Sequence, residues 1–317
     1  MTKTTQVAAD RDHDEANSVL PAEVARGVYI ENPPSAEALK LMHLLIGTAG
    51  GRMADDVRHD LRLADIKAVE GMRNHSRASL RTLFAELAGA VLIFDDTETQ
   101  CEIIGGFLDR AKLDYRHEVS DDLLVAWWFG GAFREMAAAS CHWAILDRQT
   151  VFALTSKYSI LLFQHIASLV NLENVNSKSF AVPELRAVLG VPDGKMPYFK
   201  SLNQRALKPA IAEINRTSPR LALAATPNKI GRKVVSVTIS WTEKPLAEKR
   251  EGKAELDRHS AGRRHRQAGT AERIAEHPPF PDSIHSFRGG FWETVYRDAG
   301  CKADMEGSIP AGGEMTL

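Results

Sequence analysis

The sequence predicts an α+β fold, with two tandem winged helix-turn-helix domains that carry short β-hairpin wings, a flexible charged linker and a small helical tail. The chain has 317 residues, 44% hydrophobic and 26% charged, which is typical of a globular protein with room for two domains. Three helical patterns followed by strand patterns give the order of a winged helix, and this order occurs twice. We therefore expect five segments: a disordered N-terminal tail (1–27), a first winged-helix domain (28–148), a second winged-helix domain (149–243), a charged linker (244–279) and a C-terminal segment (280–317).

The first domain is expected to begin with a helix that has Ser35 as its N-cap, because apolar residues recur at helical spacing after it. Two more helices and three strands complete the expected plan, over residues 60–72 and 76–87 and over residues 90–94, 101–108 and 110–117. The aromatic stretch 123–133 is expected in the core or at an interface.

The second domain repeats the order. Its helices are expected over residues 154–171, 181–191 and 198–217, and a hairpin follows. In the second strand of that hairpin, Val237, Ile239 and Trp241 alternate with polar residues, which is the pattern of a half-buried strand.

The third helix of the second domain lies in a strongly basic stretch. Between residues 195 and 233, nine Lys or Arg residues stand against the single acidic residue Glu213, a net charge of +8 in a chain whose total is −1. A solvated surface normally mixes both signs, so this one-sided charge favours nucleic-acid binding. The basic residues are Lys195, Lys200, Arg205, Lys208, Arg216, Arg220, Lys229, Arg232 and Lys233.

On a helical wheel, the polar face of this helix carries the residues expected to contact DNA. In the major groove, Arg205 can bind guanine through two hydrogen bonds, and Gln204 can pair with adenine. Lys200, Ser201 and Lys208 are suited to phosphates, which fix the position of the protein without reading the sequence.

Two other groups of cations are candidate DNA contacts. The tip of the hairpin is expected to reach a phosphate or the minor groove through Lys229, Arg232 and Lys233. The third helix of the first domain begins with a weaker group of the same kind, formed by Arg73, Arg77 and Arg81.

Pro209 falls inside the expected helix 198–217. A proline in a helix interior removes one backbone hydrogen bond and usually kinks the helix, at a cost of about 3 kcal/mol. We therefore expect a bend at Pro209, where the helix leaves the DNA side and turns into the core.

Residues 195–241 resemble the second winged-helix domain of the plasmid replication initiators of the Rep-3 type. The resemblance rests on Phe199–Lys200, on the motif R-x-L-x-P-A-I-x-E-I-N from residue 205 to residue 215, and on G-R-K-V at 231–234. It implies binding to double-stranded DNA at origin repeats (iterons), opening of adjacent AT-rich DNA and recruitment of host replication proteins such as helicase and initiator. It also implies a homodimer that represses its own gene.

Other classes of function fit the sequence less well. The stretch 190–196 lacks P-loop spacing, and no H-E-x-x-H, C-x-x-C or paired metal-binding histidines occur, so we expect no enzyme activity, no cofactor and no metal. Three distant cysteines and the lack of a signal peptide or membrane-spanning run indicate a cytoplasmic protein with no membrane partner. The alternatives left open are a winged-helix transcriptional regulator without a replication role and a partner-binding protein without a DNA role.

Overall fold

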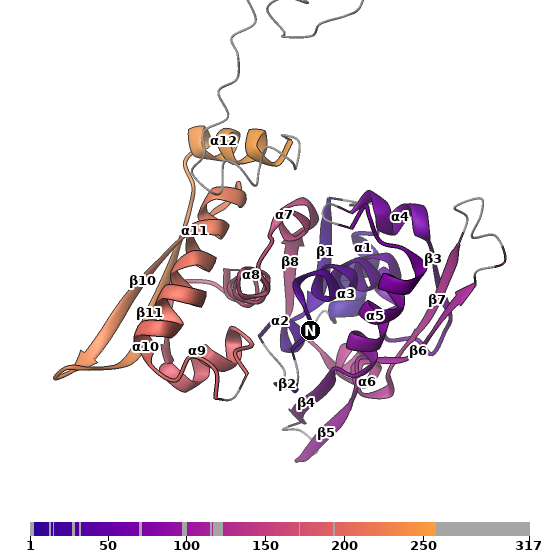
Figure 1. Cartoon of the computed structure of the whole chain (residues 1–317), viewed down its shortest axis with the longest axis horizontal. Coiled ribbons are helices and arrows are strands. Elements are labelled where there is room, and N and C mark those ends of the chain that lie inside the picture. Colours follow the sequence, from indigo (N-terminus) through magenta and orange to yellow (C-terminus); the bar gives the residue numbers. More distant parts are fainter. Residues whose placement is uncertain are drawn as a thin grey trace, which may run out of the picture. The chain divides into compact units, whose positions relative to one another are not determined.

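The computed structural model describes residues 3–257, apart from 13, 15, 27–28, 32, 70–71, 97–99, 115, 117–122, 171 and 193. They belong to one compact unit, residues 1–269. The structure is mixed α and β, as the sequence predicts (Figure 1). Most of the expected linker and the whole expected C-terminal segment lie outside the described residues.

The N-terminal residues are part of the fold, so the prediction of a disordered tail is wrong for the described part of 3–26. They form α1 (Thr4–Asp10), β1 (Asn17–Pro21) and α2 (Ala22–Arg26). β1 pairs antiparallel with β8 (Trp143–Asp147), and Val19 and Leu20 are buried. These elements are too short to show a periodic pattern, and they are held by contacts with one another, with residues 36–52 and with β8 and α8.

The first half then follows the order helix, strand, helix, helix, hairpin. Its elements are β2 (Tyr29–Glu31), α3 (Ala36–Ala49), a 3-10 turn (Gly50–Arg52), β3 (His59–Arg62), α4 (Leu63–Ala68), α5 (Arg77–Ala88), β4 (Val91–Asp96), β5 (Cys101–Gly106), β6 (Leu108–Asp114), β7 (Leu124–Phe129) and α6 (Gly131–Ala139). Ser35 caps α3 as predicted, accepting a hydrogen bond from the backbone N–H of Ala38 at 3.3 Å. The expected helix 60–72 is wrong at its start, because residues 59–62 alternate between buried and exposed positions as strand β3.

The aromatic stretch 123–133 lies in the core of this half. Trp127 and Phe129 on β7 and Phe133 on α6 are fully buried. Phe107 packs edge-on against Phe133 with ring centroids 4.9 Å apart, and His59 stacks on Trp127 at 5.4 Å. Burial of these aromatic rings contributes to the folding of this half, together with the aliphatic core.

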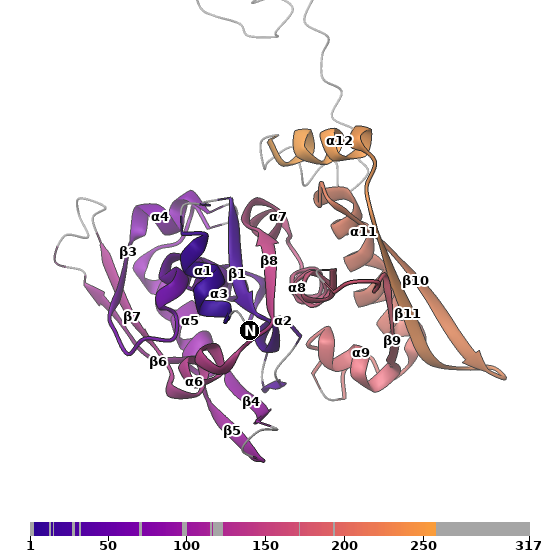
Figure 2. The ribbon, with the colours of Figure 1, turned by 180° about the vertical axis from the view of Figure 1, so that it is seen from behind.

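The second half repeats the order with a different strand pairing. Its elements are α7 (Arg148–Ala153), α8 (Lys157–Val170), β9 (Ser177–Ala181), α9 (Val182–Val188), α10 (Phe199–Leu202), a π-helical turn (Asn203–Leu207), α11 (Lys208–Thr217), β10 (Leu221–Ile230), β11 (Lys233–Glu243) and α12 (Leu246–Asp257). Here β9 joins the hairpin by pairing with β11, as in a winged helix. In the first half, β2 pairs with β4 of the β4–β5 pair, and β3 pairs with β7 of the β6–β7 pair. The β10–β11 hairpin is longer than the short wing we expected, and its tip extends beyond the helices in both views (Figures 1 and 2).

A buried polar contact joins the two halves along α8. The ring Nε2 of His43, on α3, lies 3.0 Å from Oε1 of Gln164, and the Gln164 amide donates to the carbonyl of Val24 at 3.2 Å. Burial lowers the pKa of His43 to about 4, and burial likewise lowers the pKa of His165 to about 4. Both imidazoles are therefore neutral at physiological pH.

Helix α12 packs against the end of α11, so the part of the expected linker that the structure describes is helical. Gly252 makes this approach possible, because a Cβ at that position would lie 2.9 Å from Cα of Pro219. The ammonium of Lys244 binds the carbonyl oxygens of Asn215 and Ser218, which are orphan acceptors at the C-terminus of α11.

Candidate nucleic-acid interface

The helical run 199–217, called the basic helix from here on, is fixed at its start by contacts that leave its outer face free. The Arg186 guanidinium, on α9, donates to the carbonyl of Met196 at 2.6 Å and to that of Lys195 at 2.5 Å. The Ser201 hydroxyl donates to the carbonyl of Tyr198 at 2.8 Å within the first turn. Arg186 thus holds the loop before the helix, a role that the sequence alone did not indicate.

Pro209 is accommodated by a π-helical turn. The chain stays helical through residues 199–217, and the turn Asn203–Leu207 comes immediately before Pro209, which occupies the first turn of α11. A proline at this place has no N–H to donate and needs room for its ring near residue 205. The wider π turn supplies that room and lies before Pro209. The bend at Pro209 itself stays a prediction.

Several residues of the motif 205–215 hold the domain together. Leu207, Ala210 and Ile214 are buried in the core. Glu213 is also buried, and its carboxylate accepts hydrogen bonds from the backbone N–H of Thr155 at 2.8 Å, from the Thr155 hydroxyl at 2.6 Å and from the Ser159 hydroxyl.

Asn215 completes this set by binding the backbone of β10. Its side-chain amide donates to the carbonyl of Leu223 at 2.8 Å, and its side-chain oxygen accepts from the N–H of the same residue at 2.7 Å. The helix is therefore locked to the first strand of the wing, which fixes the distance between the two elements.

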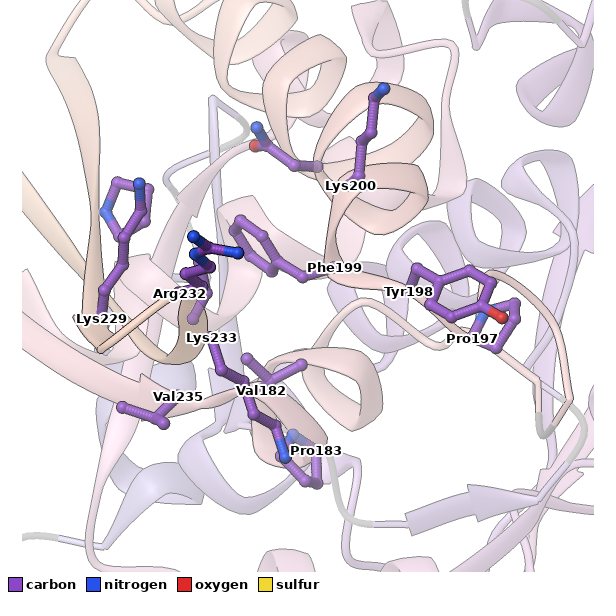
Figure 3. A pocket seen from close by; sticks show the side chains of 13 residues that line it. Val182, Pro183, Pro197, Tyr198, Phe199, Lys200, Lys229, Arg232, Lys233 and Val235 are labelled. Carbon is purple, nitrogen blue, oxygen red and sulfur yellow. The ribbon is translucent and has the colours of Figure 1, made fainter.

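A groove of about 830 Å³ lies between the N-terminal end of the helix and the wing. Figure 3 shows Phe199 and Lys200 on the helix side, Lys229 and Arg232 on the wing side, and Val182 and Pro183 at the start of α9. Four cations line the groove, and its thirteen lining residues include no carboxylate: Val182, Pro183, Pro197, Tyr198, Phe199, Lys200, Asn203, Pro227, Lys229, Arg232, Lys233, Val234 and Val235.

The structure brings part of the predicted site together in this groove. Lys200, Lys229, Arg232 and Lys233 line it and are exposed. Lys195, Gln204, Arg205 and Lys208 are exposed next to the groove or further along the helix, and Ser201 is half-buried. Within the described ranges, the lysines and arginines of this set form no ion pair with a carboxylate, so their charge is available to a polyanion.

Arg216 differs from the rest of the set. It is half-buried, and its Nε is buried without a hydrogen-bond partner in the described part of the chain. The helical wheel places Arg216 on the polar face of the helix, and the structure shows its side chain half-buried there.

In the first half, the predicted cations cluster at the start of α5. Arg73 and Arg81 are exposed, and Arg77 is half-buried. The helix begins at an N-cap formed by Ser76 and Ser79, and Nδ1 of His75 lies 3.0 Å from the Ser79 hydroxyl. His75 therefore has a capping role in this helix.

Two features, metal-ion sites and membrane-spanning helices, were looked for in the described part of the chain. No group of three or more His, Cys, Asp or Glu side chains is placed there to hold a metal ion. No helix in that part of the chain combines the length and the apolar character needed to span a bilayer.

Comparisons with known proteins concern the second winged helix and the fold. Residues 181–241 match the family model described as "Initiator Rep protein, WH2", which runs from the last residue of β9 to Trp241 in β11. A search of curated protein sequences finds no match. Among solved structures, the chain is similar to one described as "Crystal structure of Pi initiator protein in complex with iteron DNA", with a TM-score of 0.57, 15% identity, and coverage of 73% of this chain and 98% of that one. The predicted resemblance to the plasmid replication initiators of the Rep-3 type is thus confirmed, in sequence over the second winged helix and in fold over most of the chain.

Proposed function

We propose that this protein initiates plasmid replication by binding double-stranded DNA at repeated sites of an origin. The observation that carries the proposal is the groove between α10 and the β10–β11 wing, with four exposed cations and no carboxylate among its lining residues. Phosphates supply most of the affinity for such a surface, because each neutralised phosphate releases a counterion. The family match of residues 181–241 connects this surface to initiator Rep proteins.

The finer steps of the function rest on the resemblance. We propose that binding opens adjacent DNA, that host helicase and initiator are recruited to it, and that a homodimer represses the gene of the protein. In this proposal the chain acts by binding and has no catalytic role.

The test is a salt titration of binding to DNA from the region that flanks the gene of this protein. For the full chain, log Kobs should fall linearly with log salt, with a slope that corresponds to several phosphates. Combined replacement of Lys229, Arg232 and Lys233 by Ala should make that slope shallower by about 0.9 for each lost phosphate contact. The matched control replaces the exposed cations Arg250 and Lys253 of α12, which lie outside the groove. A slope near zero for the full chain would refute DNA binding through this surface.

Footprinting on the same DNA separates an initiator from a transcriptional regulator. Protection of several direct repeats beside an AT-rich stretch supports the initiator. Protection of one inverted repeat over the promoter, with none at direct repeats, supports a regulator without a replication role.

A further inference from the structure

The tip of the β10–β11 hairpin carries one large apolar side chain that the fold does not cover. Ile230 is 73% exposed, whereas Val237 and Ile239, nearer the base of the wing, are fully buried. It is the last residue of β10 and pairs with Lys233 across the turn formed by Gly231 and Arg232. In the described structure, this exposed side chain therefore contributes little to packing.

The turn holds this side chain at the extreme end of a stiff ribbon. Gly231 has φ +60°, a left-handed conformation that suits glycine and permits a two-residue turn. Below the tip, the Asn228 amide donates to the hydroxyls of Ser236 at 3.1 Å and Thr238 at 2.9 Å, which ties the two strands together. The strand register shifts between Asn228 and Lys229, and such a bulge changes the direction of the strand end.

The surroundings of Ile230 identify its ligand by charge. Lys229, Arg232 and Lys233 flank it and are all exposed, and none of the residues 228–235 is acidic. An apolar side chain between cations is suited to a ligand that combines a dense row of negative charges with an apolar interior. The DNA minor groove has this character, because phosphates line its rim and stacked bases form its floor.

The dimensions favour entry of the tip side chain alone. Paired strands lie about 4.8 Å apart, whereas the minor groove is only about 6 Å wide. A whole ribbon with its side chains does not fit, but one branched aliphatic side chain at a two-residue turn does. Proteins that bind the minor groove commonly insert Ile, Leu or Phe between two base pairs, partly unstack them and bend the duplex.

We propose that Ile230 is an apolar wedge that enters the minor groove next to the major-groove site of α10 and unstacks one base step. This inference rests on the proposed function and adds a position and a mechanism to it. Lys229, Arg232 and Lys233 hold the flanking phosphates, and the wedge makes the DNA bend toward the body of the protein.

The test uses the full chain and the duplex that it selects from a randomised library, labelled with 2-aminopurine at successive steps. For the wild type, fluorescence should rise at one step upon binding, and circularly permuted fragments should show a bend. Ile230→Thr should abolish both signals while it keeps the β-branched side chain that a strand favours. Its affinity should be roughly tenfold lower, because the apolar contact is lost. Its salt slope should be unchanged, because no phosphate contact is removed.

The control is Leu246→Ala, which removes another exposed apolar side chain, 65% exposed at the start of α12. It should keep the wild-type fluorescence and bend. If Ile230→Thr keeps both signals, the wedge is refuted while the DNA-binding function stands. If the wild type selects no duplex from the library, the proposed function fails and the wedge fails with it.

Discussion

Glu213 and Thr155 form a double hydrogen bond between α11 and the loop before α8, in which one carboxylate oxygen accepts from both the backbone N–H and the hydroxyl of Thr155. The one acidic residue of the basic stretch is therefore buried in the contact between α11 and α8. Its charge supports the packing of the domain and is kept away from the surface that faces the groove.

Glu213→Ala should therefore destabilise the protein more than most substitutions in this helix. It leaves the buried donors of Thr155 and Ser159 without an acceptor, which should lower the free energy of unfolding by about 2–4 kcal/mol. Urea unfolding measures this change. The matched control is Glu184→Ala, which removes an exposed carboxylate of α9 whose ion pair with Lys178 lies at the surface, and it should cost about 0.5 kcal/mol. Equal losses in the two variants would contradict the packing role of Glu213.

Arg205 and Lys208 should differ in what they contribute to DNA binding, although both are exposed on the same helix. Arg205→Ala should lower the preference for the selected duplex over a scrambled one by about 1–3 kcal/mol, because a guanine contact is lost. Lys208→Ala should weaken both duplexes equally and reduce the salt slope by about 1. Competition binding on the two duplexes distinguishes the effects, and an equal loss on both from Arg205→Ala would rule out base reading by that residue.

Pro209→Ala should affect recognition more than stability. Alanine permits a regular α turn where the proline requires a π turn, so the N-terminal end of the helix can rotate relative to its buried face. The free energy of unfolding should change by less than about 1 kcal/mol, because the ring is exposed and alanine favours helix. Binding to the selected duplex should weaken, and unchanged binding would show that the π turn does not set the position of Gln204 and Arg205.

Acidification should destabilise the contact between the two halves. His43 titrates at about 4 in the folded chain, below its ordinary pKa of 6.5. Between these values the unfolded chain binds more protons than the folded chain. The contribution of His43 to the free energy of unfolding is therefore fully present above pH 6.5 and is lost as the pH falls to 4. The contribution of His43 is about 3 kcal/mol, and His165, whose pKa also falls to about 4, acts in the same direction.

Urea unfolding at several pH values measures this dependence. His43→Gln keeps a side-chain amide near Gln164 and removes the titrating group, so it should flatten the dependence between pH 6.5 and 4. If the variant loses stability on acidification as steeply as the wild type, His43 does not carry the effect.

The parts of the fold that the sequence predicts are those with strong local patterns. Ser35 and Ser76 mark the starts of α3 and α5 because hydroxyl caps act within three residues. The alternation from Val237 to Trp241 predicts β11 because its period is local too. The basic stretch likewise predicts which segment lines the groove, since charge can be counted along the chain.

The remaining parts depend on partners far away in the sequence. β1 is a strand because β8 pairs with it, and nothing in residues 17–21 indicates that pairing. The roles of Glu213 and Asn215 depend on Thr155 and on the backbone of Leu223, which the tertiary fold brings to them. The role of Arg186 also depends on the tertiary fold, which brings its guanidinium next to the backbone carbonyls of residues 195 and 196.

The position of α12 also shows where a label can be attached without blocking the groove. The groove lies at the start of α10, whereas α12 packs at the end of α11, and the helical run 199–217 between them spans about 28 Å. A fluorophore attached to an exposed residue of α12, such as Lys253, is therefore tethered at the end of the domain remote from the groove. Such a label can report on the bound complex without obstructing the face through which it forms.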